Sequence, residues 1–224
     1  MNINADFDKR ASAHAADTPW VASPMAGVDR RMLDRIGGEV ARATTIVRFA
    51  PGSAFSPHVH TGGEEFLVLE GVFQDEHGDF PVGSYIRNPP QSSHTPASAP
   101  GCTIFVKLWQ FDLADRTHVR TETTDGAYTQ TAKGVETLPL FHDDHEDVVM
   151  ERWAPGAQVT LDAPDGLEVL VLDGDFNEGG ETFAPQSWLR LPQDACSTAQ
   201  AGPDGAKVWI KRGHLKTTPS APKV

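Results

Sequence analysis

The chain has 224 residues, of which 39% are hydrophobic and 22% charged, and its formal net charge at pH 7 is -12. This acidic balance argues against nucleic acid and anionic membrane surfaces as partners, since both attract basic patches. No apolar run approaches the length of a membrane span, and the first residues lack the apolar core of a signal peptide. The two cysteines, Cys102 and Cys196, have no paired CxxC spacing, which favours free thiols in a reducing cytosol. We therefore expect a cytoplasmic protein.

Residues 1–27 are rich in Ala, Asp and Ser and show little periodicity, so we expect a peripheral N-terminal arm. From Val28 onward, short runs of β-branched and aromatic residues alternate with Gly and Pro turns. The clearest runs cover residues 42–49, 66–73, 84–89 and 102–111. Many short strands with hardly any helical period predict an all-β sandwich or barrel.

The second half of the chain repeats the first. The sequence RFAPG at 48–52 returns as RWAPG at 152–156, FLVLEG at 66–71 as VLVLDG at 169–174, and SYIR at 84–87 as SWLR at 187–190. Because the matches keep their order and lie 103 or 104 residues apart, they indicate a tandem duplication. We predict β domains at 28–111 and 134–218, joined by a linker over 112–133.

One stretch of the first copy carries metal-binding chemistry. In a β-strand, side chains alternate between faces, so His58 and His60 should point to the same side. The glycines of Thr61-Gly62-Gly63 allow a tight reversal, after which Glu64 begins the returning strand. Divalent metals of borderline softness favour this mixture of imidazole nitrogen and carboxylate oxygen. We predict a metal site here that also includes the later His94.

The duplication serves as an internal control, because residues present in one copy only are candidates for a site. None of the four predicted ligands is kept in the second copy. The equivalent positions pair His58 with Asp162, His60 with Pro164, Glu64 with Leu167, and His94 with Ser197. We therefore predict one metal site in the first domain and a second domain without metal ligands.

These residues resemble the two motifs of the cupin superfamily. Gly52, His58, His60, Glu64 and Gly71 fit the first motif without a gap, and the second is matched by Gly83, Pro89 and His94. Gln91 and Ser98 depart from the second motif, where a glycine and an asparagine are usual. The resemblance implies two tandem cupin domains, that is, a bicupin of jelly-roll β-barrels.

Within the superfamily, the stretch from Pro57 to Pro96 and the following GCTIFVK are most similar to the cupin domain of ChrR-type anti-sigma factors. That resemblance implies zinc on His58, His60, Glu64 and His94, and a role in sensing oxidative stress. The sigma factor is held in that family by an N-terminal domain with a His-xxx-Cys-xx-Cys signature. Residues 1–28 do not match it, so a sigma factor is only weakly expected as a partner.

The residues leave the metal and the activity open. Zinc is favoured, but iron, nickel or manganese would keep further positions for water or substrate. One hypothesis is a stress- or small-molecule-responsive regulator, and the alternative is a mononuclear metal-dependent dioxygenase acting on a small organic substrate. Exposed strand edges also favour homodimerisation.

Other reactive side chains receive structural interpretations. We interpret His142-Asp143-Asp144-His145 as a solvated turn and Cys102 as a small buried residue. The remaining histidines, which have no partner at ligand spacing, are interpreted as surface residues: His14, His77, His118 and His214.

Overall fold

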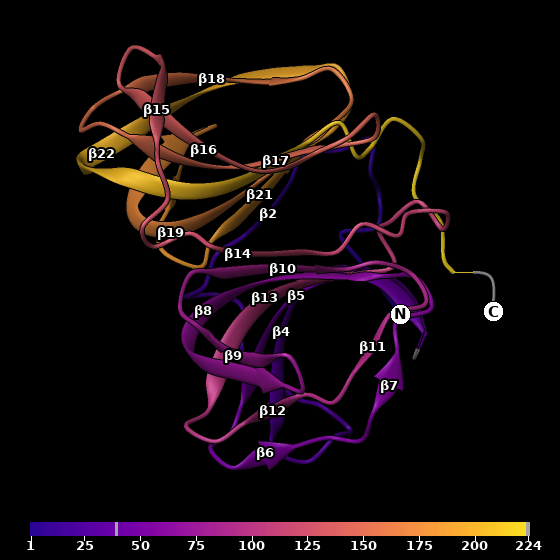
Figure 1. Cartoon of the computed structure of the whole chain (residues 1–224). Helices are drawn as coiled ribbons and strands as arrows, with labels where there is room; N and C mark the ends of the chain where they lie inside the picture. The colour runs from indigo at the N-terminus through magenta and orange to yellow at the C-terminus, as the bar shows by residue number, and fades with distance from the viewer. Residues whose placement is uncertain (39, 223–224) are drawn as a thin grey trace. The chain divides into compact units, whose positions relative to one another are not determined.

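The computed structural model describes residues 1–38 and 40–222, and every regular element within them is a β-strand, as expected for an all-β protein. No helix in these residues has the length and apolarity that crossing a membrane requires. The chain forms two compact units, drawn in Figure 1. The leading unit comprises residues 1–5, 19–125 and the chain from Ser220 onward, and the trailing unit comprises residues 6–18 and 126–219.

The leading unit is built on an antiparallel sheet with the central order β1-β4-β5-β13-β8-β10-β14. Its strands are β1 (Asn2–Ile3), β3 (Val21–Ala22), β4 (Val28–Gly37), β5 (Ala41–Phe49), β6 (Ser53–Ala54), β7 (His58–Val59), β8 (Glu64–Asp75), β9 (Gly78–Pro81), β10 (Ser84–Asn88), β11 (Ser93–His94), β12 (Ala97–Ser98), β13 (Cys102–Leu108) and β14 (Val119–Glu122).

Alternation along these strands explains the core of the leading unit. Phe66 and Val68 on β8 point to one side and join a buried apolar cluster with Ile86 on β10 and Ile104 on β13. Burying such side chains contributes about 1.5–3 kcal/mol each relative to leaving them in water. Glu64 precedes Phe66 by two positions, so the same alternation turns its carboxylate toward the inner face of the unit.

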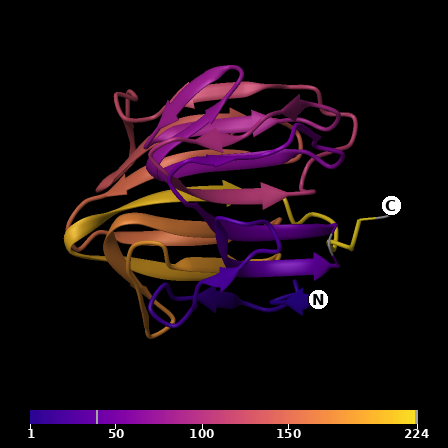
Figure 2. The same cartoon turned by 90° about the horizontal axis from the view of Figure 1, so that it is seen from below.

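The trailing unit is built on an antiparallel sheet with the central order β15-β16-β17-β22-β19-β21-β2. Its strands are β2 (Ala11–Ala13), β15 (Thr129–Ala132), β16 (Val135–His142), β17 (Asp147–Trp153), β18 (Gln158–Ala163), β19 (Leu167–Glu178), β20 (Glu181–Phe183), β21 (Trp188–Leu191) and β22 (Ala195–Arg212). The long strand β22, drawn yellow in Figure 2, pairs with β17, β18 and β19.

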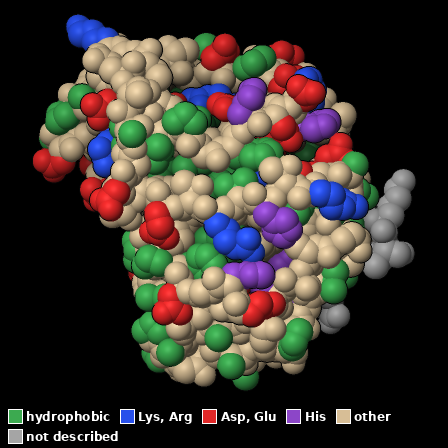
Figure 3. Space-filling view, viewed as in Figure 1, with side chains coloured by type: hydrophobic (Ala, Val, Ile, Leu, Met, Phe, Trp, Pro, Cys, Tyr) green, Lys and Arg blue, Asp and Glu red, His purple; other side chains and the backbone are tan. Residues whose placement is uncertain are grey.

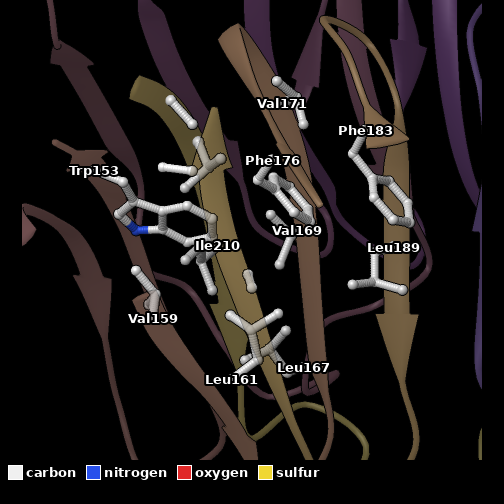
Figure 4. Packing of buried hydrophobic residues seen from close by; sticks show 14 of the residues in the cluster. Trp153, Val159, Leu161, Leu167, Val169, Val171, Phe176, Phe183, Leu189 and Ile210 are labelled. Atoms are coloured by element: carbon white, nitrogen blue, oxygen red, sulfur yellow. The ribbon is translucent and has the colours of Figure 1, made fainter. Parts of the chain in front are cut away.

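Aromatic and aliphatic side chains fill the interior of the trailing unit, as Figure 4 shows. Phe176 and Phe183 stack with their ring centroids 4.8 Å apart, and Trp153 meets Phe176 edge-on at 5.3 Å. Leu167 is fully buried in the same cluster. This position is occupied by Glu64 in the leading unit, so an apolar side chain here removes the carboxylate that a metal site would need.

One repeated glycine has the same structural task in both units. Gly71 and Gly174 have φ values of +69° and +67°, a left-handed conformation that side chains strain. A Cβ atom at either position would also overlap the backbone carbonyl of Gly101 or Gly205 on the neighbouring strand. The close approach of the two strands therefore requires glycine at both positions.

Residues 1–27, the expected arm, contribute strands to both units. β1 and β3 pair with β4 in the leading unit, whereas β2 pairs with β21 in the trailing unit, with Ser12 opposite Leu189. Residues 112–133, the expected linker, contain β14, which pairs with β10, and β15, which pairs with β16. Both segments are thus tied into sheets by backbone hydrogen bonds.

The surface reflects the acidic composition. Asp and Glu side chains are spread over the face drawn in Figure 3, in keeping with 31 acidic residues against 19 Lys and Arg. Like charges dispersed in this way favour solubility and repel polyanions.

Candidate metal centre

Three elements of the leading unit bring the predicted ligands together. β7 and β11 form a two-stranded sheet (Figure 1). In this sheet His94 lies directly opposite His58. His60 follows β7, and Glu64 is the first residue of β8. One ligand atom from each of the four residues lies within 4.8 Å of the others.

The donor atoms converge on a common point. His60 Nε2 is 3.2 Å from His58 Nε2 and 3.4 Å from Glu64 Oε2, and His94 Nε2 is 3.5 Å from the same Glu64 oxygen. A cation bonded at about 2.0–2.2 Å to such donors requires them to lie about 3–3.5 Å apart. The geometry of the four residues therefore fits a divalent metal ion.

The second ring nitrogen of each histidine faces a hydrogen-bond acceptor. Nδ1 lies 3.4 Å from the Ser56 carbonyl in His58, 3.1 Å from Ser92 Oγ in His60, and 3.3 Å from Asp75 Oδ2 in His94. The Ser92 hydroxyl already donates to the Pro89 carbonyl at 2.6 Å, which leaves its lone pair for His60. Protons on the Nδ1 atoms would satisfy these acceptors and would leave the Nε2 lone pairs directed at the cluster.

The loop between His60 and Glu64 is held by backbone bonds and aromatic rings. The His60 amide donates to Ser92 O at 2.8 Å, and the Gly63 amide donates to His60 O at 3.4 Å. A Cβ at Gly62 would overlap the Trp109 ring, and one at Gly63 would overlap Phe111. Trp109 itself has a φ of +59°, a left-handed conformation uncommon for a bulky residue and typical of functional sites.

Burial differs among the ligands. His58 is exposed, whereas His60 and His94 are buried and Glu64 is half-buried. The cluster therefore opens to solvent on the side of His58, so an ion or a small molecule could approach there without unfolding the unit.

Two of the histidines have shifted pKa values in opposite directions. Burial lowers the pKa of His60, because desolvation disfavours the charged imidazolium more than the nearby Glu64 favours it. Burial acts in the same direction on His94, but the hydrogen bond to Asp75 and the charge of Glu64 outweigh it, so the pKa of His94 is raised. Of these two ligands, His94 is therefore the one at which protons compete with a cation first as the pH falls.

The other histidines bear out only part of the sequence interpretation. His142, the last residue of β16, has an exposed side chain beside Asp147, and the solvated turn expected here covers the following residues 143–146. Interpreting His214 as a surface residue was wrong: its side chain is 3% exposed and lies 2.8 Å from Glu168 in the trailing unit. His14 is also partnered, because its Nε2 lies 2.7 Å from Glu181. Neither contact was visible from sequence, since each joins segments far apart in the chain.

The two cysteines are free. Cys102 is buried, in agreement with its interpretation as a small core residue, and Cys196 is exposed. Burial raises the pKa of the Cys102 thiol to about 11, which keeps it protonated and unreactive near neutral pH.

The class of protein follows from this fold and from comparison with known proteins. Residues 8–112 match the sequence model of the ChrR Cupin-like domain. Similar solved structures include a proposed dioxygenase from Nostoc punctiforme (14% identity, 100% of this chain and 86% of the other covered, TM-score 0.72). Others are a proposed glyoxylate-induced protein from Pseudomonas aeruginosa (14%, 100% and 93%, TM-score 0.72) and the protein Ylba from E. coli (14%, 94% and 93%, TM-score 0.71).

These similarities define an all-β protein of the cupin fold with a His3Glu cluster that could hold a metal ion. More particularly, residues 8–112 resemble the ChrR Cupin-like domain, and the whole chain has the fold of the cupin structures to which it is similar. No curated protein matches the chain by sequence.

Proposed function

We propose that the protein is a metal-dependent regulatory cupin that binds one divalent ion at His58, His60, Glu64 and His94 and responds to a reactive small molecule. Zinc is the favoured ion, because four ligands of this type saturate its tetrahedral shell. In this proposal the trailing unit is a second cupin domain that has lost its ligands, which makes the chain a bicupin. Its interior, filled around Leu167, supports that assignment.

The observation that carries the proposal is the convergence of three Nε2 atoms and one carboxylate oxygen within 4.8 Å of one another. A bound ion supplies positive charge that keeps the four ligands in place. Oxidation or displacement of a ligand would therefore also affect the fold around the ion. The likeness of residues 8–112 to the ChrR Cupin-like domain supports a sensing role. A reactive molecule would reach the site on the exposed side of His58.

Elemental analysis of the purified protein, before and after chelation and reloading with zinc, tests the site. We expect one ion per chain, lost in the His58→Ala and His94→Ala variants. The trailing unit supplies matched controls at the equivalent positions, Asp162→Ala and Ser197→Ala, which should retain the ion. Retention of a full equivalent by both histidine variants would contradict the assignment.

The sensing role is tested separately, by treating the zinc-loaded protein with peroxide or singlet oxygen and following zinc release with a chromogenic chelator. Release that is faster than from the same zinc-loaded protein without oxidant supports it. A protein that holds zinc unchanged under both oxidants would contradict it. Capture of a sigma factor by the immobilised protein would extend the proposal to the partner implied by the ChrR resemblance.

The second candidate is a mononuclear dioxygenase, and the exposure of His58 is the observation that favours it. A ligand on the solvent side leaves room for a substrate beside the ion, and one similar structure belongs to a proposed dioxygenase. Oxygen uptake by iron-loaded protein with diketone and phenolic substrates tests this. Uptake abolished by Glu64→Ala would favour the enzyme, and tight zinc without turnover would exclude it.

A further inference from the structure

A buried carboxylate lies behind the ligand cluster. Asp75, the last residue of β8, has a side chain only 3% exposed. Its Oδ2 atom lies 3.3 Å from His94 Nδ1, and its Oδ1 atom accepts a hydrogen bond from the His77 amide at 2.7 Å. Among the residues that the structure describes, no Lys or Arg forms an ion pair with Asp75, so this carboxylate is directed at the imidazole.

The contact determines which nitrogen of His94 carries the proton. An ionised carboxylate only accepts hydrogen bonds, so the proton of a neutral His94 must lie on Nδ1. The Nε2 atom is then a bare lone pair. This atom is buried without a hydrogen-bond partner in the described part of the chain, and it faces Glu64 Oε2 at 3.5 Å. An unpartnered lone pair inside a protein is unfavourable unless a cation or a donor occupies the space before it.

We propose that Asp75 is a positioning residue for the metal centre: it holds His94 as the Nδ1–H tautomer and aims the Nε2 lone pair at the ion. The proposal deepens the metal-binding function and rests on it. Among the three histidine partners, Asp75 is the one with a formal charge, because the other two are a carbonyl and a hydroxyl. A charged acceptor makes the stronger hydrogen bond and raises the basicity of the ligand.

The trailing unit shows what becomes of this position when the ligand is lost. Its equivalent carboxylate is Glu178, which is also 3% exposed and accepts a 2.5 Å hydrogen bond from Ser197, the residue equivalent to His94. There the charge is neutralised by Arg10, whose guanidinium lies 2.7 Å from Glu178. The fold therefore places an acidic residue here in both units. Only in the leading unit does its partner present a metal-binding nitrogen.

The variant Asp75→Asn separates positioning from folding. Asn can still accept the His77 amide bond through its oxygen, which preserves the turn, but it then presents an NH2 donor to His94 Nδ1. A donor at that place favours the opposite tautomer, with the proton on Nε2, and so blocks the ligand atom. The neighbouring Glu76→Gln is the matched control. It removes a carboxylate that accepts from the Thr95 amide at 2.8 Å and makes no bond to the imidazole.

Two measurements are made on the full chain. Long-range ¹H–¹⁵N NMR of the metal-free protein above the His94 pKa reports the tautomer, and zinc affinity is measured by competition with a chelator. We expect the Nδ1–H form in wild type and Glu76→Gln, the Nε2–H form in Asp75→Asn, and a loss of about 10–100-fold in zinc affinity for Asp75→Asn alone.

An unchanged tautomer, or an unchanged zinc affinity, in Asp75→Asn would overturn the proposal. An equal loss in Glu76→Gln would also overturn it, because general electrostatics would then account for the effect. If wild type bound no zinc, the proposed metal function would fail, whereas the tautomer in the metal-free protein would still show whether Asp75 orients His94.

Discussion

The Nε2 atom of His94 lies 3.5 Å from the Oε2 atom of Glu64, although His94 is on strand β11 and Glu64 is on strand β8, which belong to different sheets. The antiparallel pairing of β11 with β7 brings His94 to its place, and the turn after His60 brings Glu64. Without an ion, this carboxylate is surrounded by imidazoles that attract it fully only when they are protonated. The site is therefore arranged so that a cation replaces protons.

Glu64→Leu introduces into the leading unit the residue type that the trailing unit has at the equivalent position, Leu167. Losing a residue that hydrogen-bonds a metal ligand typically lowers metal affinity about 10–100-fold. We expect a larger loss of zinc affinity here, because a direct ligand is removed. The metal-free protein should keep its folding stability at pH 7, since an apolar side chain needs no partner in the core. Chelator competition and urea unfolding measure the two effects. The reciprocal variant Leu167→Glu should destabilise the protein by burying an uncompensated charge.

The opposite pKa shifts of His60 and His94 predict opposite effects of pH on the metal-free protein. The raised pKa of His94 gives a stability contribution that is complete below the ordinary value of 6.5 and is lost as the pH rises through its folded-state pKa. The lowered pKa of His60 gives a contribution present above 6.5 that is lost as the pH falls through its folded-state pKa. Urea unfolding of chelated protein between pH 5 and 8 should therefore show the alkaline decline removed in His94→Ala and the acid decline removed in His60→Ala. Identical profiles for both variants would refute the assignment.

Gly62 should tolerate no side chain. Its φ is not in the left-handed region, so the cost of Gly62→Ala comes from overlap with the Trp109 ring rather than from backbone strain. We expect a loss of about 1–3 kcal/mol in the free energy of unfolding, the usual range for overpacking, with weaker zinc binding because the ligand loop shifts. Gly38→Ala is a control, since no atom lies within 4 Å of its added Cβ and its φ is ordinary. Equal stability of the two variants would show that the ring contact does not constrain the loop.

The N-terminal segment should be required for the stability of the trailing unit. Arg10 pairs with Glu178 at 2.7 Å and with Glu181 at 2.6 Å, and the Glu178 side chain is 3% exposed. Arg10→Ala leaves a buried carboxylate without its cation, so we expect a loss of about 1–3 kcal/mol in the free energy of unfolding. Lys9→Ala, which removes an exposed cation next to it, should change stability by less than about 0.5 kcal/mol. Thermal unfolding of both variants compares them, and equal melting temperatures would contradict this role.

The two thiols should differ in reactivity. Cys196 is exposed and should react with an aromatic disulfide reagent within minutes at pH 8, whereas Cys102 should react only in denaturant because it is buried and its pKa is raised to about 11. One fast thiol in the wild type and none in Cys196→Ser is the expected count. A fast second thiol would mean that Cys102 is accessible and could sense oxidants directly.

Much of the site could be predicted because its signals are local. The alternation of His58 and His60, the glycine turn and Glu64 lie within one short stretch, and the loss of all four ligands from the second copy made them stand out. The strand runs were equally visible, since their apolar periodicity is local.

The remaining features depend on pairing between distant segments. Ala11–Ala13 is too short, and its side chains are too small, to signal a strand, yet it completes the trailing sheet beside β21. Asp75 was missed because it directly precedes an acidic turn and looks solvated in the sequence, and the position of its partner His94 is set by the pairing of another strand. The available signal was that the second copy also has an acidic residue, Glu178, at the position equivalent to Asp75. This signal becomes meaningful only when its partner Ser197 is known to occupy the position equivalent to His94.

The proposed metal centre is tested by the metal content of wild-type protein beside the His94→Ala and Ser197→Ala variants, measured by mass spectrometry of the intact chain under native conditions. We expect one divalent ion in wild type and Ser197→Ala and none in His94→Ala. An ion retained in His94→Ala, or lost in Ser197→Ala, would contradict it.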